Sequence, residues 1–155
     1  MFKILIAEDD TELLTLFKRV LTKSGYMAKG VAKGQEALNM LNDEYFDLII
    51  SDIMMPVMDG YKLVRSMRDI GINIPVLMIT AKDAFDDMRM GFLSGTDDYM
   101  VKPVNINEMV LRVGALLRRA QMINDRRQVI GSTVLEYDSM TVTTNGESLV
   151  LPQKE

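Results

Sequence analysis

The feature that most limits the fold of this 155-residue sequence is an alternation of short apolar runs with segments of helical periodicity. Leu13, Phe17 and Leu21, for example, share one helical stripe. Strand and helix patterns in alternation are typical of βαβ units, and hence of a parallel sheet with helices on both faces. We therefore predict an α/β fold with a doubly wound sheet. Its strands are expected at Ile4–Ala7, Tyr26–Val31, Leu48–Ser51, Val76–Ile79 and Tyr99–Val101.

The pattern changes after residue 120. Residues 121–130 are polar and charged and form either a helix extension or a linker. From 131 to 155 apolar and polar residues alternate, and Asn145-Gly146 is a strong hairpin motif. We expect a partial antiparallel β meander there, with too little apolar material to fold alone. The predicted boundaries are thus 2–120, 121–130 and 131–155, the last being the start of a second domain.

The composition excludes several kinds of site. The chain has no cysteine and no histidine, which removes disulfides, thiolate or imidazole metal sites and the serine–histidine triad. Eighteen basic and 22 acidic residues give a net charge of −4, with no overall excess of basic charge for nucleic acid. We find no apolar run of membrane-spanning length and no signal-peptide layout, so a cytoplasmic location is expected.

Residues with complementary chemistry follow four of the five predicted strands. In a doubly wound sheet, ligands bind outside the carboxyl ends of the strands, where these side chains are expected to meet. Aspartate after a strand is also a frequent helix N-cap, so Asp9 or Asp10 alone has a structural explanation. The strand-end residues are Glu8-Asp9-Asp10, Asp52, Thr80 and Lys102-Pro103.

Clustered carboxylates repel one another, and a hard divalent cation relieves that repulsion. Oxygen ligands without histidine or cysteine fit Mg²⁺. A cation beside Lys102 and Thr80 suits a phosphoryl group, and Asp52 would be the nucleophile that forms an aspartyl phosphate. The sequence has no glycine-rich P-loop, so the phosphoryl group is expected from a partner or a small donor.

Four motifs, in order and at family spacing over residues 2 to 120, resemble the receiver (CheY-like) domain of bacterial two-component response regulators. They are Ile4-Leu5-Ile6-Ala7-Glu8-Asp9-Asp10, Ser51-Asp52-Ile53-Met54-Met55-Pro56 with Asp59-Gly60, Ile79-Thr80-Ala81, and Asp97-Asp98-Tyr99-Met100-Val101-Lys102-Pro103. The resemblance implies a flavodoxin-like fold with strand order 2-1-3-4-5. It also implies that a sensor histidine kinase phosphorylates the chain.

The resemblance assigns roles to individual residues. Asp52 would be the phosphoacceptor, with Thr80 and Lys102 contacting the phosphoryl group. Tyr99 would be an aromatic switch that turns inward together with Thr80, and the Lys102–Pro103 bond would be cis. The implied Mg²⁺ ligands are Glu8, Asp9, Asp52 and the backbone carbonyl of Met54.

The tail resembles the first sheet of the winged-helix effector domain in OmpR/PhoB-type transcription regulators. DNA binding would then belong to a longer parent protein and not to this fragment. In that subfamily, active receivers form a homodimer through the fourth helix, fifth strand and fifth helix. Met88 and Arg89 depart from the pattern of that face. The residues that match its ion pairs are Asp97, Asp98, Glu108, Arg112 and Arg119.

Two other functions are considered. A haloacid-dehalogenase-like phosphohydrolase also uses Asp, Thr, Lys and Mg²⁺, but there the nucleophile follows the first strand, whereas Asp52 ends the third. The other alternative is a receiver that works as a docking module without phosphorylation. The preferred prediction is a phospho-accepting signalling domain, not a conventional enzyme, with Mg²⁺ as its cofactor.

Overall fold

A computed structural model of the chain describes residues 1–81 and 95–136. For residues 125–136 it describes the helical backbone and not the side chains. The departures expected at Met88 and Arg89 lie outside the described residues. The elements in order are β1 (Lys3–Ala7), α1 (Thr11–Lys23), β2 (Met27–Val31), α2 (Gly34–Asp43), β3 (Leu48–Asp52), α3 (Gly60–Asp69), β4 (Val76–Thr80), β5 (Asp98–Val101) and α5 (Ile106–Glu136). Each strand lies within two residues of its predicted bounds.

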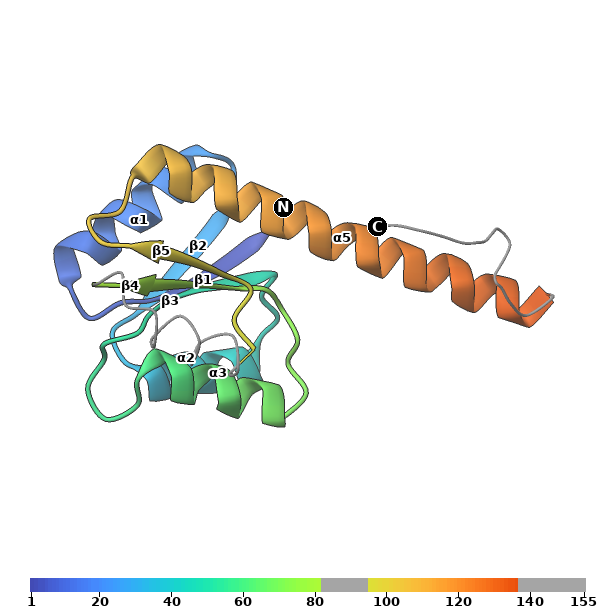
Figure 1. Ribbon diagram of the computed structural model, residues 1–155, viewed down its shortest axis with the longest axis horizontal. Coiled ribbons are helices and arrows are strands. Elements are labelled where there is room, and N and C mark those ends of the chain that lie inside the picture. Colours follow the sequence, from blue (N-terminus) through green and yellow to red (C-terminus); the bar gives the residue numbers. More distant parts are fainter. Residues whose placement is uncertain (82–94, 137–155) are drawn as a thin grey trace. The chain divides into compact units, whose positions relative to one another are not determined.

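The strands form one parallel sheet in the order β2-β1-β3-β4-β5 (Figure 1). This confirms the predicted flavodoxin-like sheet. β3 and β4 are buried along their whole length, as expected for central strands covered on both faces. Because all strands run in the same direction, the carboxyl ends of β1, β3, β4 and β5 lie at one edge, where the predicted site residues follow.

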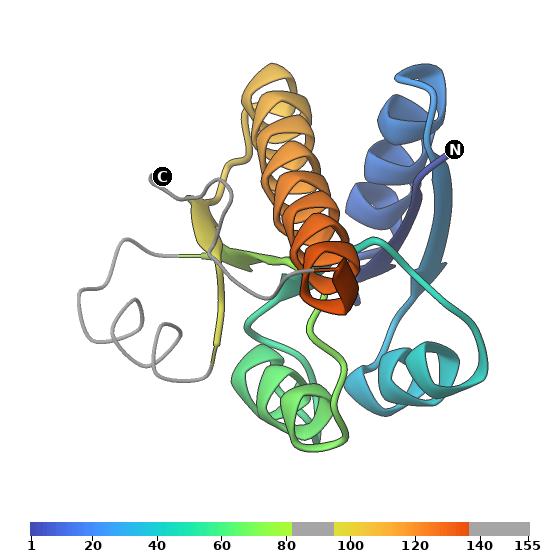
Figure 2. The ribbon, with the colours of Figure 1, turned by 90° about the vertical axis from the view of Figure 1, so that its right-hand side faces the viewer.

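Two hydrophobic clusters hold the helices against the sheet, one on each face. On one face α2 and α3 pack on alternate strand residues such as Leu5, Ile49 and Met78. On the other, α1 and the first part of α5 pack on the intervening residues, including Ile6 and Ile50. Figure 2 shows these two helix layers with the sheet between them. The period of two along each strand therefore assigns neighbouring side chains to opposite cores.

Local sequence sets the ends of the helices near the site. The carboxylate of Asp10 caps α1 by accepting hydrogen bonds from the backbone N–H groups of Glu12 and Leu13. Asp59 caps α3 in the same way, through the N–H of Lys62. Gly71 follows α3 at φ 88°, a left-handed conformation that costs glycine little.

Helix α5 continues beyond the part of the chain that carries the site. Contacts divide the chain into one unit at Met1–Leu117 and another at Arg118–Glu155. Residues 121–130 belong to α5, which is the helix extension that the sequence left open. Residues 131–136 are also helical, where the alternating pattern predicted extended chain, because an established helix propagates at little further cost. The rest of the predicted meander lies outside the described residues.

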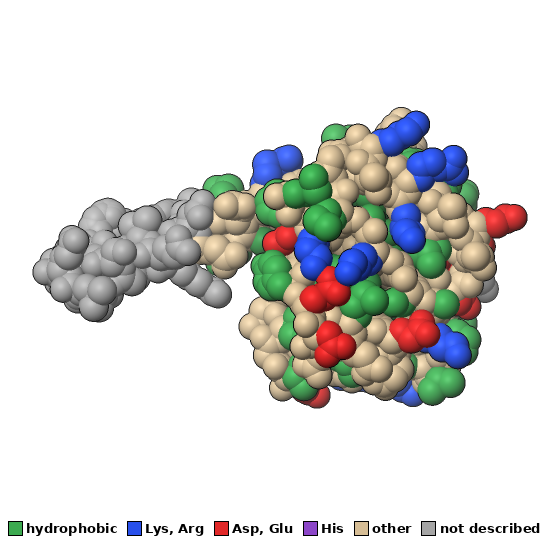
Figure 3. Space-filling view, turned by 180° about the vertical axis from the view of Figure 1, so that it is seen from behind, with side chains coloured by type: hydrophobic (Ala, Val, Ile, Leu, Met, Phe, Trp, Pro, Cys, Tyr) green, Lys and Arg blue, Asp and Glu red, His purple; other side chains and the backbone are tan. Residues whose placement is uncertain are grey.

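Basic and acidic side chains lie among hydrophobic ones on the face drawn in Figure 3. Several charged side chains form ion pairs within the chain. The carboxylate of Glu44, for instance, binds the ammonium groups of both Lys3 and Lys29. Within the described part of the chain, no helix combines the length and the apolar character that crossing a membrane requires.

Candidate functional site

Three carboxylates converge at the carboxyl edge of the sheet. Glu8 and Asp9 are the two residues directly after β1, and Asp52 is the last residue of β3. One carboxylate oxygen from each lies within 4.8 Å of the others. Glu8 and Asp52 are each only 2% exposed, whereas Asp9 is exposed. The pairing of β1 with β3 therefore brings together acidic residues that are far apart in the sequence.

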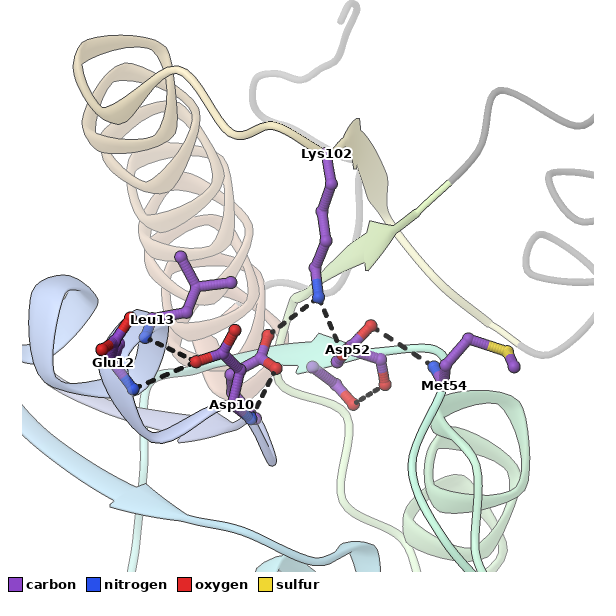
Figure 4. Close-up of polar contacts among 8 residues, drawn as sticks. Asp10, Glu12, Leu13, Asp52, Met54 and Lys102 are labelled. Atoms are coloured by element: carbon purple, nitrogen blue, oxygen red, sulfur yellow. Dashed lines mark hydrogen bonds and ion pairs between the residues drawn. The ribbon is translucent and has the colours of Figure 1, made fainter.

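In the part of the chain that the structure describes, one lysine faces this acidic cluster. Lys102 follows β5, and its Nζ lies 3.0 Å from Asp52 Oδ2 and 3.5 Å from Glu8 Oε1. Figure 4 shows the side chain reaching across the strand ends toward Asp52. The backbone N–H of Lys102 donates to the carbonyl of Thr80, and the Lys102–Pro103 peptide is cis, as the family resemblance implies. β5 thus delivers its cation to the cluster from the far side of β4.

The electrostatics of Glu8 are unfavourable without a cation. Burial raises the pKa of Glu8 to about 7, and the nearby charge of Asp52 adds to the increase, while the N–H of Asp10 and the charge of Lys102 oppose it. Burial lowers the pKa of Lys102, but the hydrogen bond and charge of Asp52 outweigh it, so the net pKa is raised. One lysine therefore compensates the cluster only in part.

The donor set fits Mg²⁺. All three side chains offer carboxylate oxygens, the ligands that this ion prefers. Among the described residues, the buried Glu8 Oε1 accepts no hydrogen bond and contacts Lys102 Nζ at 3.5 Å as an ion pair, so it can also bind a second cation. This acidic triad is typical of the Mg²⁺ site of receiver domains. When bound, Mg²⁺ would supply positive charge beside Asp52.

The other two residues expected to respond to phosphorylation lie on neighbouring strands. Thr80 ends β4 and is 3% exposed, at the same sheet edge as Asp52. Tyr99 lies on β5, is 7% exposed and belongs to the core cluster on the side of α2 and α3. Met78 of β4 pairs in register with Tyr99, and Thr80 with Val101. The tyrosine ring therefore lies inward in this structure.

The loop after Asp52 is fixed by short-range contacts. The backbone N–H of Met54 donates to Asp52 Oδ1 at 3.3 Å, while the Met54 side chain points away from the carboxylates (Figure 4). Val57 has φ 69° and lies inside a three-residue turn closed by the Met58 N–H and the Pro56 carbonyl, an uncommon and strained turn. The loop thus keeps the backbone of Met54 next to the acidic cluster.

Glycine is required where this loop enters α3. A Cβ on Gly60 would lie 2.6 Å from the backbone oxygen of Asp52 and 2.8 Å from Met78 Sδ. The Gly60 N–H also donates to the carbonyl of Ile53 at 2.9 Å. The backbone of the candidate nucleophile therefore packs directly against the start of α3.

Four of the five residues expected at the dimer face form ion pairs within the chain. Both oxygens of Asp98 accept from Arg112 Nη1, at 2.9 and 2.8 Å, and Arg112 also pairs with Glu108 one turn earlier on α5. The hydrogen bond to Asp98, followed by that to Glu108, raises the pKa of Arg112. Arg119 is exposed and forms no ion pair with any side chain in the described ranges.

Sequence reasoning missed the partner of Asp97. Asp97 Oδ2 accepts from Arg68 Nη2 at 3.3 Å and from the backbone N–H of Val76 at 2.8 Å. Arg68 lies in the last turn of α3, and a basic residue there is common at any helix end. Its particular role depends on loops that only the folded chain brings together.

Known proteins resemble this chain in sequence. The sequence model of the family named response regulator receiver domain matches residues 4–114. The heme response regulator HssR of Staphylococcus epidermidis is 37% identical over the whole chain, which covers 69% of that protein. The transcriptional regulatory protein AfsQ1 of Streptomyces coelicolor is 36% identical, again over the whole chain and 68% of its own length.

Solved structures agree. The receiver domain of the Francisella response regulator 1452 superposes with a TM-score of 0.74 at 35% identity, covering 77% of this chain and 99% of that one. A CheY-like receiver domain protein from Methanospirillum hungatei gives a TM-score of 0.75 at 27% identity, covering 79% and 98%. Together with the acidic triad at the sheet edge, these matches show that the chain belongs to the response regulator receiver family, whose members are signalling modules of two-component systems.

Proposed function

We propose that this receiver accepts a phosphoryl group on Asp52 from the phosphohistidine of a sensor histidine kinase. The observation that carries the proposal is the contact of Asp52 Oδ2 with Lys102 Nζ, 3.0 Å, inside a cluster of three carboxylates. In the transfer, an Asp52 oxygen would attack phosphorus as the P–N bond breaks and the imidazole leaves. Lys102 and Thr80 would bind the phosphoryl oxygens, with Mg²⁺ held by Glu8, Asp9, Asp52 and the Met54 carbonyl.

The burial of Thr80 and Tyr99 on adjacent strands supports a role as switch residues. A phosphoryl group at Asp52 would draw the Thr80 hydroxyl toward it, and the inward position of Tyr99 would be favoured as a result. β5 would carry this change to the surface that it forms with α5. Two such receivers would then pair through Asp97, Asp98, Glu108, Arg112 and Arg119.

The wider setting belongs to the same proposal. The printed name of AfsQ1 describes a transcriptional regulator, and this supports control of transcription by a longer protein that joins the receiver to a winged-helix domain over 131–155 and beyond. We place 2–120 in the receiver and 121–130 in the connection. DNA would be bound by that effector domain, and the protein would work in the cytoplasm.

The test is phosphorylation by acetyl phosphate followed by intact-mass measurement. The chain should gain one phosphoryl group when Mg²⁺ is present and none after chelation, and Asp52→Asn should gain none. Asp10→Asn is a matched control because asparagine also caps helices well, and it should react like the unaltered chain. Equal modification of Asp52→Asn would refute the assignment.

A further inference from the structure

The side chain of Arg68 joins two loops at the amino edge of the sheet. Its Nη1 donates to the carbonyls of Ile72 at 3.0 Å and Ile74 at 2.7 Å, in the loop before β4. Its Nη2 donates to the carbonyl of Gly95 at 2.8 Å and to Asp97 Oδ2 at 3.3 Å, before β5. The Arg68 side chain, only 21% exposed, therefore fixes the starts of both strands through one guanidinium.

These contacts use one oxygen of the Asp97 carboxylate and leave the other, Oδ1, able to accept a further hydrogen bond. Both Arg68 and the Val76 N–H donate to Oδ2, and among the described residues no donor reaches Oδ1. The Asp97 side chain is 37% exposed. The carboxylate is thus held through one oxygen while the other can accept a donor from outside the chain.

The neighbouring acid differs. Both oxygens of Asp98 are taken by Arg112 within the chain. A carboxylate can accept about four hydrogen bonds, so Asp97 need not release Arg68 to bind a second cation. In the described part of the chain Asp98 accepts three hydrogen bonds and Asp97 two, both at Oδ2, so Asp97 keeps more capacity to bind a partner.

We propose that Arg68 is a positioning residue of the dimer face, which holds Asp97 so that Oδ1 can accept a cation from a second copy of the chain. The inference rests on the proposed function, because the pairing belongs to the activated receiver. Arg68 acts on Asp97 directly and on its backbone through Gly95. Fixing a side chain before association removes part of the ordering cost, in two symmetric copies, which corresponds to about a tenfold change in the dimer Kd.

The experiment measures the dimer Kd of the 155-residue chain by sedimentation equilibrium with beryllofluoride and Mg²⁺. Arg68→Gln should raise the Kd about tenfold. Arg65→Gln, an exposed arginine on the same helix, should leave it unchanged. Asp97→Asn, which keeps an oxygen for the Val76 N–H, should also raise the Kd. Adding Arg68→Gln to Asp97→Asn should then have no further effect.

A lower Kd for Arg68→Gln would overturn the inference by showing that Arg68 competes for Asp97. Equal increases with and without Asp97→Asn would also overturn it, since Arg68 would then act on the loops alone. If Arg68→Gln does not fold, Arg68→Lys keeps the charge and should give a smaller increase of the same sign. Beryllofluoride that fails to raise the melting temperature would instead refute the proposed function itself.

Discussion

The two edges of the central sheet use charge in opposite ways. At the carboxyl edge, Glu8, Asp9 and Asp52 face Lys102, and within the described ranges a buried oxygen of Glu8 accepts no hydrogen bond. At the amino edge the charges are compensated locally. Arg68 binds three carbonyls and a carboxylate there, for example.

The difference separates stability from function. Hydrogen bonds from Lys3 and then Lys29 lower the pKa of Glu44 at the amino edge, whereas burial raises that of Glu8 at the carboxyl edge. Charged groups that favour the folded state lie at one edge, and charged groups that oppose it lie where a ligand would bind. Functional sites are commonly kept at a cost in stability.

The largest expected loss of stability comes from removing the Arg68 contacts at the amino edge. Arg68→Ala should lower the free energy of unfolding by about 4 kcal/mol, because several partly buried carbonyls lose their donor at once. Urea denaturation measures the change. Arg65→Ala on the same helix is the control and should stay within about 0.5 kcal/mol of the unaltered chain. Similar losses in the two variants would contradict the assigned role of the amino edge.

At the carboxyl edge, by contrast, removing a charged group is expected to raise the free energy of unfolding. Because the pKa of Glu8 is raised from 4.5 to about 7, its contribution to stability is complete below pH 4.5 and is lost as the pH rises through 7. Glu8→Gln resembles the protonated acid at every pH. Without Mg²⁺ it should therefore be more stable by about 3 kcal/mol at pH 8 and by less than about 1 kcal/mol at pH 5. Denaturation at both pH values tests this, and a variant less stable at pH 8 would contradict it.

Backbone packing beneath the acidic cluster is expected to behave differently from its charges. Gly60→Ala should destabilise the chain by about 2 kcal/mol and weaken Mg²⁺ binding, since the added Cβ meets the backbone of Asp52. Gly30→Ala offers a contrast because the three atoms nearest to its added Cβ all belong to the side chain of Leu14, which can move. Calorimetric Mg²⁺ titration and urea denaturation measure the two effects. Unchanged Mg²⁺ affinity in Gly60→Ala would contradict the prediction, because it would show that the packing at Gly60 does not affect the Mg²⁺ site.

The smallest effect concerns an exception at the amino edge. The hydroxyl of Thr96, just before β5, is buried and finds no hydrogen-bond partner among the residues that the structure describes. Thr96→Val keeps the shape and removes the unpaired group, so it should raise the melting temperature by an amount equivalent to about 1 kcal/mol. Thr15→Val, which removes a hydroxyl that donates to the Thr11 carbonyl, should give no such gain. A loss of stability in Thr96→Val would mean that this hydroxyl has a partner in solution.

The sequence predicted the carboxyl edge better than the amino edge. Strand positions follow from apolar runs, and parallel strands bring their ends together, so the meeting of Glu8, Asp52 and Lys102 could be foreseen. The Arg68 contacts depend on carbonyls in two loops and have no local pattern. The helical state of 131–136 was missed because alternation over a few residues is a weak guide where a helix already runs.

The central claim is that Asp52 carries the phosphoryl group. Borohydride reduces an acyl phosphate to an alcohol, so treatment of the phosphorylated chain would convert the acceptor aspartate to homoserine. Peptide mass spectrometry should then find homoserine at position 52 and unchanged aspartate at positions 9 and 10. Homoserine at either of those positions, with Asp52 intact, would contradict the account.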